Sequence, residues 1–149
     1  MLDVLKYQRP EDAPSSAGKG RIEIKDVGIT FGKGAEIHRA VETTTITIEP
    51  GEFVCILGPS GCGKSTLMNA VAGYVTPTEG EVRVDGKLIT KPGQDRGMVF
   101  QQYSLMPWKT VYENVAFGPK MAGHSRVEAG SIANTFLNMV GLSKFGDRY

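Results

Sequence analysis

Apolar and polar residues alternate along the first half of the chain in a pattern that predicts β-strands. Residues 21–27 alternate strictly, as in a strand with one buried face, and residues 41–48 are β-branched at nearly every position. Residues 53–57 form the longest uninterrupted apolar run, which is typical of a strand covered on both faces. We therefore expect two neighbouring strands near the N-terminus and, after them, a buried strand of a parallel sheet whose neighbouring strand is missing from these residues.

Other segments carry helix and turn signals. Residues 64–72 predict a helix that Gly73 ends, and residues 110–117 predict one or two helical turns. The apolar positions of residues 125–140 recur at helical spacing, so that Ser125 would cap this helix and Gly141 would end it.

Two turns and three short strands complete the predicted elements. Asp85-Gly86 between two apolar stretches, residues 81–84 and 87–89, is a strong hairpin signal. Residues 32–34, Gly-Lys-Gly, mark an earlier turn, with a connection that runs through His38. Residues 97–100 predict one more short strand.

Composition limits the classes of protein that this chain can belong to. Its 149 residues suit one domain, and 17 basic against 16 acidic residues give a net charge of +1, which argues against a nucleic-acid partner. No apolar run is long enough to cross a bilayer. Residues 1–20 combine charge with Pro, Ser and Gly, so we expect a flexible leader before an ordered domain of residues 21–149.

The strongest chemical signal is a glycine-rich loop between the buried strand and the first helix. Its sequence matches G-x-x-x-x-G-K-[ST]. The residues of this candidate site are Gly58, Pro59, Ser60, Gly61, Cys62, Gly63, Lys64, Ser65 and Thr66. Glycines let successive backbone N–H groups surround a phosphate, and the positive end of the helix dipole points at it. Lys64 would contact the outer phosphates and the Ser65 hydroxyl would ligate Mg²⁺, which predicts a nucleoside triphosphate site.

The segments around this loop resemble the ATP-binding subunits of ABC transporters. GPSGCGKSTLMNAVAGYVTPTEGEVRVDG resembles their Walker A motif and the following hairpin, and GMVFQQYSLMPWKTVYENVAFG resembles their Q-loop. The resemblance covers about residues 21–149 and implies an α/β fold. That fold would be a P-loop NTPase core of the ABC ATPase type, with an antiparallel β subdomain and the beginning of a helical subdomain. The Pro107-Trp108 pair is similar to the importer branch for nitrate, sulfonates and taurine.

The resemblance implies roles for individual residues. Gln101, with Gln102 as the competing choice, would be the Q-loop glutamine that positions water and Mg²⁺ in the complete dimer. Phe31 would stack on the adenine of ATP, and the alternative is a phenylalanine of the core. Tyr103 and Trp108 would be partly exposed and would dock a transmembrane subunit.

We expect Leu105, by contrast, to pack inside the domain. We expect surface or capping roles for His38 and His124.

Several features of the family do not occur among these 149 residues. They include no LSGGQ-type signature, no apolar strand that ends in Asp-Glu and no histidine at the switch position. We therefore expect the N-terminal portion of a longer domain, and Glu79, Asp85 and Asp95 to be solvated turn charges. Whether the chain is itself an enzyme stays open: the alternative to an importer ATPase is a nucleotide-binding fragment without turnover, and a small P-loop kinase would leave the Gln101 segment unexplained.

The same resemblance implies cofactors, partners and a location. ATP and Mg²⁺ would bind, and a second ATP-binding subunit would complete a head-to-tail dimer. Transmembrane permease subunits would contact the dimer directly, and a periplasmic or lipid-anchored solute-binding protein would act indirectly. The chain would then be cytoplasmic and peripheral on the inner face of the cell membrane.

Overall fold

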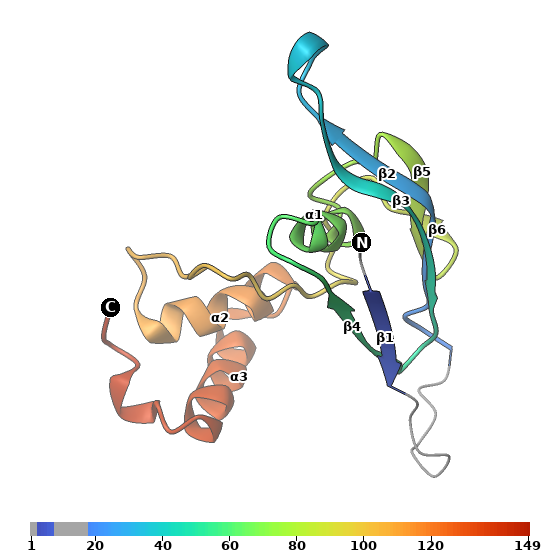
Figure 1. The fold of residues 1–149 in the computed structure, drawn as a ribbon. Coiled ribbons are helices and arrows are strands. Elements are labelled where there is room, and N and C mark those ends of the chain that lie inside the picture. The colour runs from blue at the N-terminus through green and yellow to red at the C-terminus, as the bar shows by residue number, and fades with distance from the viewer. Residues whose placement is uncertain (1–2, 8–17) are drawn as a thin grey trace. The chain divides into compact units, whose positions relative to one another are not determined.

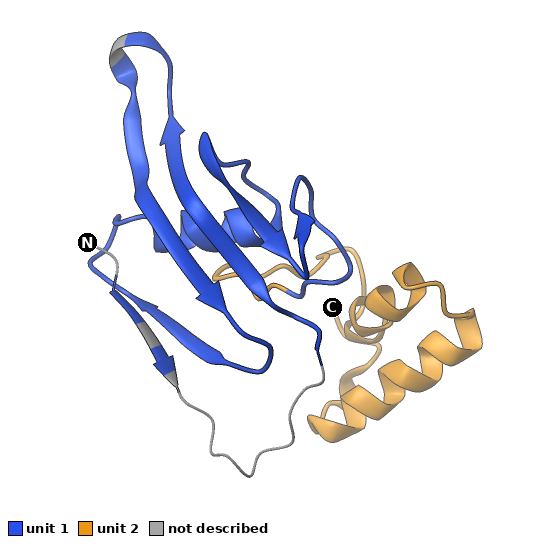
Figure 2. Cartoon of the chain, turned by 90° about the vertical axis from the view of Figure 1, so that its right-hand side faces the viewer, with its two compact units in different colours: residues 1–97 blue, residues 98–149 orange. Residues whose placement is uncertain are grey.

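A computed structural model describes residues 3–7 and 18–149 of the chain. The chain divides into unit 1, Met1–Gly97, and unit 2, Met98–Tyr149 (Figure 2). The predicted single stretch of residues 21–149 is therefore split between the two units. Within the described residues, no helix is both long and apolar enough to span a bilayer.

Unit 1 contains a four-stranded antiparallel sheet in the order β3-β2-β5-β6 (Figure 1). The strands are β2 (Ile22–Phe31), β3 (His38–Ile48), β5 (Glu79–Val84) and β6 (Lys87–Leu88). Both pairs of strands predicted from the alternation and the turn signals are confirmed. The antiparallel β subdomain is present, and β2, β3 and β5 each bury apolar side chains in the core.

The β2–β3 hairpin extends further than the sequence pattern predicts. A 3-10 turn, η1 (Gly34–Glu36), closes its tip, and β3 already begins at His38. The expected connection through His38 is thus wrong, because this residue pairs directly with Phe31 across the hairpin. Bulges interrupt the pairing along β2, including one between the Ile29 and Thr30 pairs.

The strand before the glycine-rich loop has an unexpected neighbour. β4 (Phe53–Leu57) pairs with β1 (Asp3–Tyr7), and the two strands are antiparallel. The expectation of a strand covered on both faces is wrong for β4, because its residues are half-buried or exposed. The expectation of a flexible leader is wrong for residues 3–7, and residues 8–17 lie outside the described residues.

Helix α1 (Lys64–Ala72) packs on the antiparallel sheet and forms the core of unit 1 with it. Gly73 ends the helix in a left-handed conformation, as predicted, and its N–H donates to the carbonyls of Asn69 and Ala70. The buried residues of this core are Ile24, Val27, Ile29, Val41, Leu67, Ala70, Val82, Val84 and Ile89. The phosphate-loop helix is therefore held by the strands that surround the candidate site.

Unit 2 consists mainly of two packed helices, α2 (Val111–Met121) and α3 (Arg126–Met139), followed by the 3-10 turn η2 (Ser143–Phe145). α2 is longer than predicted. The predicted caps of α3 are confirmed: Ser125 and Glu128 form a capping box, and Gly141 follows the helix with a positive φ of 73°. The predicted strand at residues 97–100 is wrong, since these residues have no regular structure.

Candidate functional site

The candidate site begins where β4 ends and α1 begins, as the sequence pattern predicts. Between them, the chain turns through the loop of residues 58–63. Gly63 is the N-cap of α1, with φ 93° and ψ 3°, a conformation that strongly favours glycine. At this end of α1, no side chain accepts a capping hydrogen bond from the first backbone N–H groups of the helix.

A contact with β3 holds the loop in place. A Cβ added to Gly63 would lie 2.1 Å from the carbonyl oxygen of Ala40 and 3.0 Å from Cγ2 of Val41. At the second loop glycine, Gly61, an added Cβ would meet nothing within 4 Å. The loop therefore lies directly against the bulged part of β3 on one side and is open on the other.

The lysine of the loop folds back over the loop itself. Its Nζ donates hydrogen bonds to the carbonyl oxygens of Gly58 at 2.8 Å and Pro59 at 2.6 Å. The same ammonium lies 3.5 Å from Sγ of Cys62. Lys64 thus places one full positive charge over the loop, where the outer phosphates of a nucleotide would need it.

The other polar groups of the loop fit the same ligand. Ser65 is exposed in the first turn of α1, and Thr66 is half-buried. A helix N-terminus with free N–H groups, a glycine loop and an ammonium together provide the donors that a phosphate chain requires. The residues present therefore fit a nucleotide phosphate chain, and the Ser65 hydroxyl fits a Mg²⁺ ligand.

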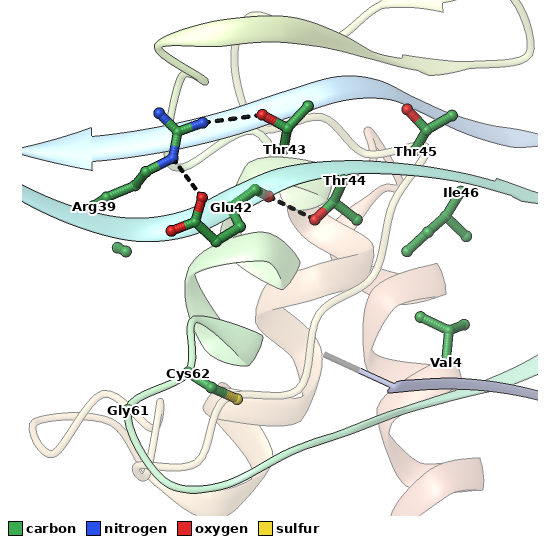
Figure 3. A pocket seen from close by; sticks show the side chains of 10 residues that line it. Val4, Arg39, Glu42, Thr43, Thr44, Thr45, Ile46, Gly61 and Cys62 are labelled. Atoms are coloured by element: carbon green, nitrogen blue, oxygen red, sulfur yellow. Dashed lines mark hydrogen bonds and ion pairs between the residues drawn. The ribbon is translucent and has the colours of Figure 1, made fainter. Parts of the chain in front are cut away.

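A cavity of about 760 Å³ lies beside the loop. Gly61 and Cys62 line it, together with residues of β3 and with Val4 of β1. In Figure 3, Glu42 and Ile46 point from β3 toward the loop and β1, and the Cys62 thiol points into the same space. Both cysteines of the chain are free, so neither forms a disulfide.

An ion-pair cluster crosses the sheet next to this cavity. The guanidinium of Arg39 on β3 donates to both carboxylate oxygens of Glu79 on β5, at 2.9 and 3.1 Å, and its Nε lies 3.0 Å from Glu42. Strand β2 lies between β3 and β5 and carries Gly28 at this point. A Cβ added to Gly28 would lie 2.7 Å from the Glu79 carboxylate. The hydrogen bond from Arg39 is the main cause that lowers the pKa of Glu79, and Glu79 in turn raises the pKa of Arg39.

Phe31, the predicted adenine contact, lies at the end of β2 and is 46% exposed. The alternative, a phenylalanine of the core, is therefore wrong. Side chains two residues apart on a strand share a face, so Phe31 lies on the face of Ile29. Ile29 pairs with Val41, the residue that contacts Gly63. The structure thus places Phe31 on the face of the hairpin against which the phosphate loop lies.

The remaining predicted site residues belong to unit 2. Gln101 is exposed in a bend, and Gln102 beside it is exposed as well. The phosphate loop, by contrast, belongs to unit 1. The role of Gln101 in positioning water and Mg²⁺ stays a prediction.

Residues after the glutamines form an exposed apolar segment. Tyr103 is 99% exposed and Trp108 is 72% exposed, while the expectation that Leu105 packs inside is wrong, since it is 68% exposed. The segment is nevertheless fixed at one point: the Asn114 side chain accepts from the Met106 N–H at 2.9 Å and donates to carbonyls of the same turn. This exposure is what a docking surface requires, and docking itself stays a prediction.

Sequence reasoning missed the contribution of β3 to the site. Ala40 and Val41 contact the loop, and His38 lies opposite Phe31. A motif search cannot find these residues, because they lie about twenty positions before the loop and carry no motif. The β-branched run that begins at Val41 could have indicated them. A strand extended from Val41 toward the N-terminus includes Ala40 and His38 and pairs with β2.

Together, these features define a class of protein. A half-buried strand, a loop that ends at a left-handed glycine and a helix that begins at a lysine form the P-loop arrangement of nucleotide-binding proteins. The chain belongs to the ABC transporter family, whose model matches residues 41–149. The predicted fold class and the resemblance are thereby confirmed.

Relatives and solved structures agree with this assignment. The chain is 49% identical over 129 residues to the nitrate import ATP-binding protein NrtD of Synechocystis sp., covering 86% of this chain and 48% of that protein. It is 46% identical to the taurine import ATP-binding protein TauB of Roseobacter denitrificans, covering 74% of this chain and 41% of the relative. A bicarbonate transport ATP-binding protein, CmpD of Synechocystis sp., is 39% identical, with 99% of this chain and 54% of the relative covered.

The structural comparison leads to the same family. A dimeric ATP-binding cassette in a post-hydrolysis state, bound to ADP and Pi, matches with a TM-score of 0.71 and 32% identity, covering 85% of this chain and 60% of that one. The chain spans about half the length of the curated relatives it matches.

Proposed function

We propose that this chain binds ATP as part of the ATP-binding subunit of an ABC importer. The observation that carries the proposal is the phosphate loop: Gly63 seats it against β3, and Lys64 places an ammonium over it. Membership of the ABC transporter family supports ATP as the nucleotide.

Each part of the site has a separate task in this proposal. Backbone N–H groups of the loop and of the first turn of α1 hold the phosphates, and Lys64 neutralises part of their charge. The Ser65 hydroxyl holds Mg²⁺, and Phe31 provides a surface for the adenine. Bound Mg²⁺ supplies charge neutralisation at the phosphate oxygens, and Gln101 orients water toward them in the complete dimer.

A small anion of the nitrate, sulfonate or taurine type is the transported solute that we propose. Relatives that import nitrate and taurine are 49% and 46% identical to this chain, which supports this group. The solute contacts other subunits in this scheme, so residues of this chain do not select it.

The proposed partners follow from the importer assignment. A second ATP-binding subunit pairs head to tail with this one, as supported by the dimeric structural neighbour. Transmembrane permease subunits dock on the exposed segment around Tyr103 and Trp108, and a solute-binding protein delivers the anion to them. The protein then works on the inner face of the cell membrane.

Calorimetric titration of the chain with ATP in Mg²⁺ buffer tests the nucleotide site. We expect Lys64→Ala to weaken ATP binding roughly tenfold to a hundredfold, because hydrogen bonds to charged groups contribute about 1.5–3 kcal/mol. Lys87→Ala is the matched control, since it removes the same charge from β6. Equal affinity of the Lys64→Ala variant and the unaltered chain, both folded by circular dichroism, would contradict the proposal.

A further inference from the structure

The hairpin face that carries Phe31 also carries a second ring. Side chains alternate between the two faces of the hairpin along β2, where Ile29 pairs with Val41, Thr30 with Arg39 and Phe31 with His38; the bulge between the first two pairs skips Ala40 on β3. His38 therefore lies on the same face as Phe31, directly opposite it. Residues directly opposite on antiparallel strands have Cβ atoms about 4.5–5.5 Å apart, which is close enough for two rings to form one surface.

This pair lies next to the phosphate loop. Val41, on the same face, has its Cγ2 only 3.0 Å from the Cβ position of Gly63. Phe31 lies two residues beyond Ile29 along β2, a rise of about 7 Å in an extended strand. A nucleotide whose phosphates lie in the loop thus reaches this face of the hairpin with its sugar and base.

Both rings are open to a ligand. Phe31 is 46% exposed, and His38 is exposed as well. Among the described residues, no hydrogen bond or ion pair of the His38 side chain is found. The tip of the hairpin beyond the two rings is tightly closed. Gly32 has φ 93°, and a Cβ added to it would lie 2.0 Å from the carbonyl oxygen of Glu36.

We propose that His38 and Phe31 together form the surface that binds the purine base, and that His38 is a second base-contacting residue. This inference rests on the proposed function, because it takes the loop as the phosphate site. Phe31 supplies a ring face for stacking. The imidazole of His38 extends this surface and adds a hydrogen-bonding nitrogen, which phenylalanine lacks.

Two ligands separate contacts to the base from contacts to the phosphates. The chain is titrated in Mg²⁺ buffer with ATP and, in parallel, with inorganic triphosphate, which has no base. We expect His38→Ala to weaken ATP binding roughly fivefold, at the low end of the range for loss of one stacking partner, and to leave binding of triphosphate unchanged. His38→Phe, which keeps a ring, should bind ATP within about twofold of the unaltered chain.

The control is His124→Ala, which makes the same change in unit 2 and should alter neither affinity. His38→Gln provides a second ringless variant if His38→Ala does not fold by circular dichroism. Unchanged ATP affinity in a folded ringless variant overturns the role of His38, as does an equal loss with both ligands. If Lys64→Ala binds ATP as the unaltered chain does, or the chain binds neither ligand, the proposed function fails as well.

Discussion

Two glycines of the phosphate loop, Gly61 and Gly63, differ in what surrounds them. Gly61 and Gly63 both have positive φ, 81° and 93°, so a side chain at either would be strained. A Cβ added to Gly63 would lie 2.1 Å from the carbonyl oxygen of Ala40, whereas a Cβ added to Gly61 would meet no atom within 4 Å. The contact with β3 therefore makes Gly63 sterically essential, beyond its conformation.

We expect Gly63→Ala to lower the free energy of unfolding by about 2 kcal/mol or more, since backbone strain costs about 1–3 kcal/mol and the clash adds to it. Urea denaturation followed by circular dichroism measures this change. Gly61→Ala is the matched control and should cost about 1 kcal/mol, the strain alone. Equal destabilisation by both substitutions would show that the Ala40 contact contributes nothing.

At this scale, the sequence predicted the loop well and its surroundings poorly. The motif identifies Gly58 to Thr66 because the phosphate site depends on consecutive backbone groups. The contact between the Ala40 carbonyl and Gly63 depends on a bulge in β3. A bulge is decided by pairing with β2 rather than by local composition. For the same reason, the position of His38 opposite Phe31 could not be deduced.

Among the elements, the antiparallel sheet is linked across its central strand by side chains. Arg39 of β3 reaches Glu79 of β5 over Gly28 of β2, the only strand between them. Because Gly28 has no side chain, the guanidinium and the carboxylate meet in the space above β2. The sheet thus gains a connection between strands that do not pair with each other.

Acid should weaken this connection. The pKa of Glu79 is lowered in the folded state, so its contribution is fully present above the unfolded value, near 4.3, and is lost as pH falls through the folded value. We expect Glu79→Gln to flatten the decrease of the unfolding free energy below about pH 4.5, measured by urea denaturation at several pH values. Glu36→Gln, at the hairpin tip, is the matched control for replacing a carboxylate with an amide in the same unit.

The sequence predicted those elements that carry their own signals. α3 was predicted because Ser125 and Gly141 mark its ends. The hairpin between β5 and β6 was predicted from Asp85-Gly86. β1 was missed because five residues of mixed polarity resemble a strand only beside β4. Residues 97–100 have the apolar content of a strand, but their backbone adopts no regular secondary structure.

At the scale of the whole molecule, the three carboxylates that were predicted to be solvated turn charges each bind a partner within the chain. Glu79 binds Arg39, Asp85 accepts hydrogen bonds from the Gly20 and Arg21 N–H groups, and Asp95 pairs with Arg96. A general base for hydrolysis must instead contact the attacking water. None of these three is therefore arranged for that task.

We expect the 149-residue chain to bind ATP and to hydrolyse it negligibly. Phosphoryl transfer depends on positioned water and on charge neutralisation around the transferred group, whereas the phosphate loop supplies only part of the second. A phosphate-release assay, with the Lys64→Ala variant as its blank, measures turnover. Robust turnover that disappears in that variant would contradict this expectation and exclude the alternative of a binding fragment without turnover.

The hydrogen bonds of Lys64 affect how nucleotide affinity should be interpreted. Its ammonium has two acceptors within the loop, the carbonyls of Gly58 and Pro59. Phosphate oxygens must therefore compete with the loop's own oxygens, and association is an exchange of acceptors. The heat released on titration then reports a difference between two sets of charge-assisted contacts, and it will be smaller than the strength of the contacts that Lys64 makes with the phosphates.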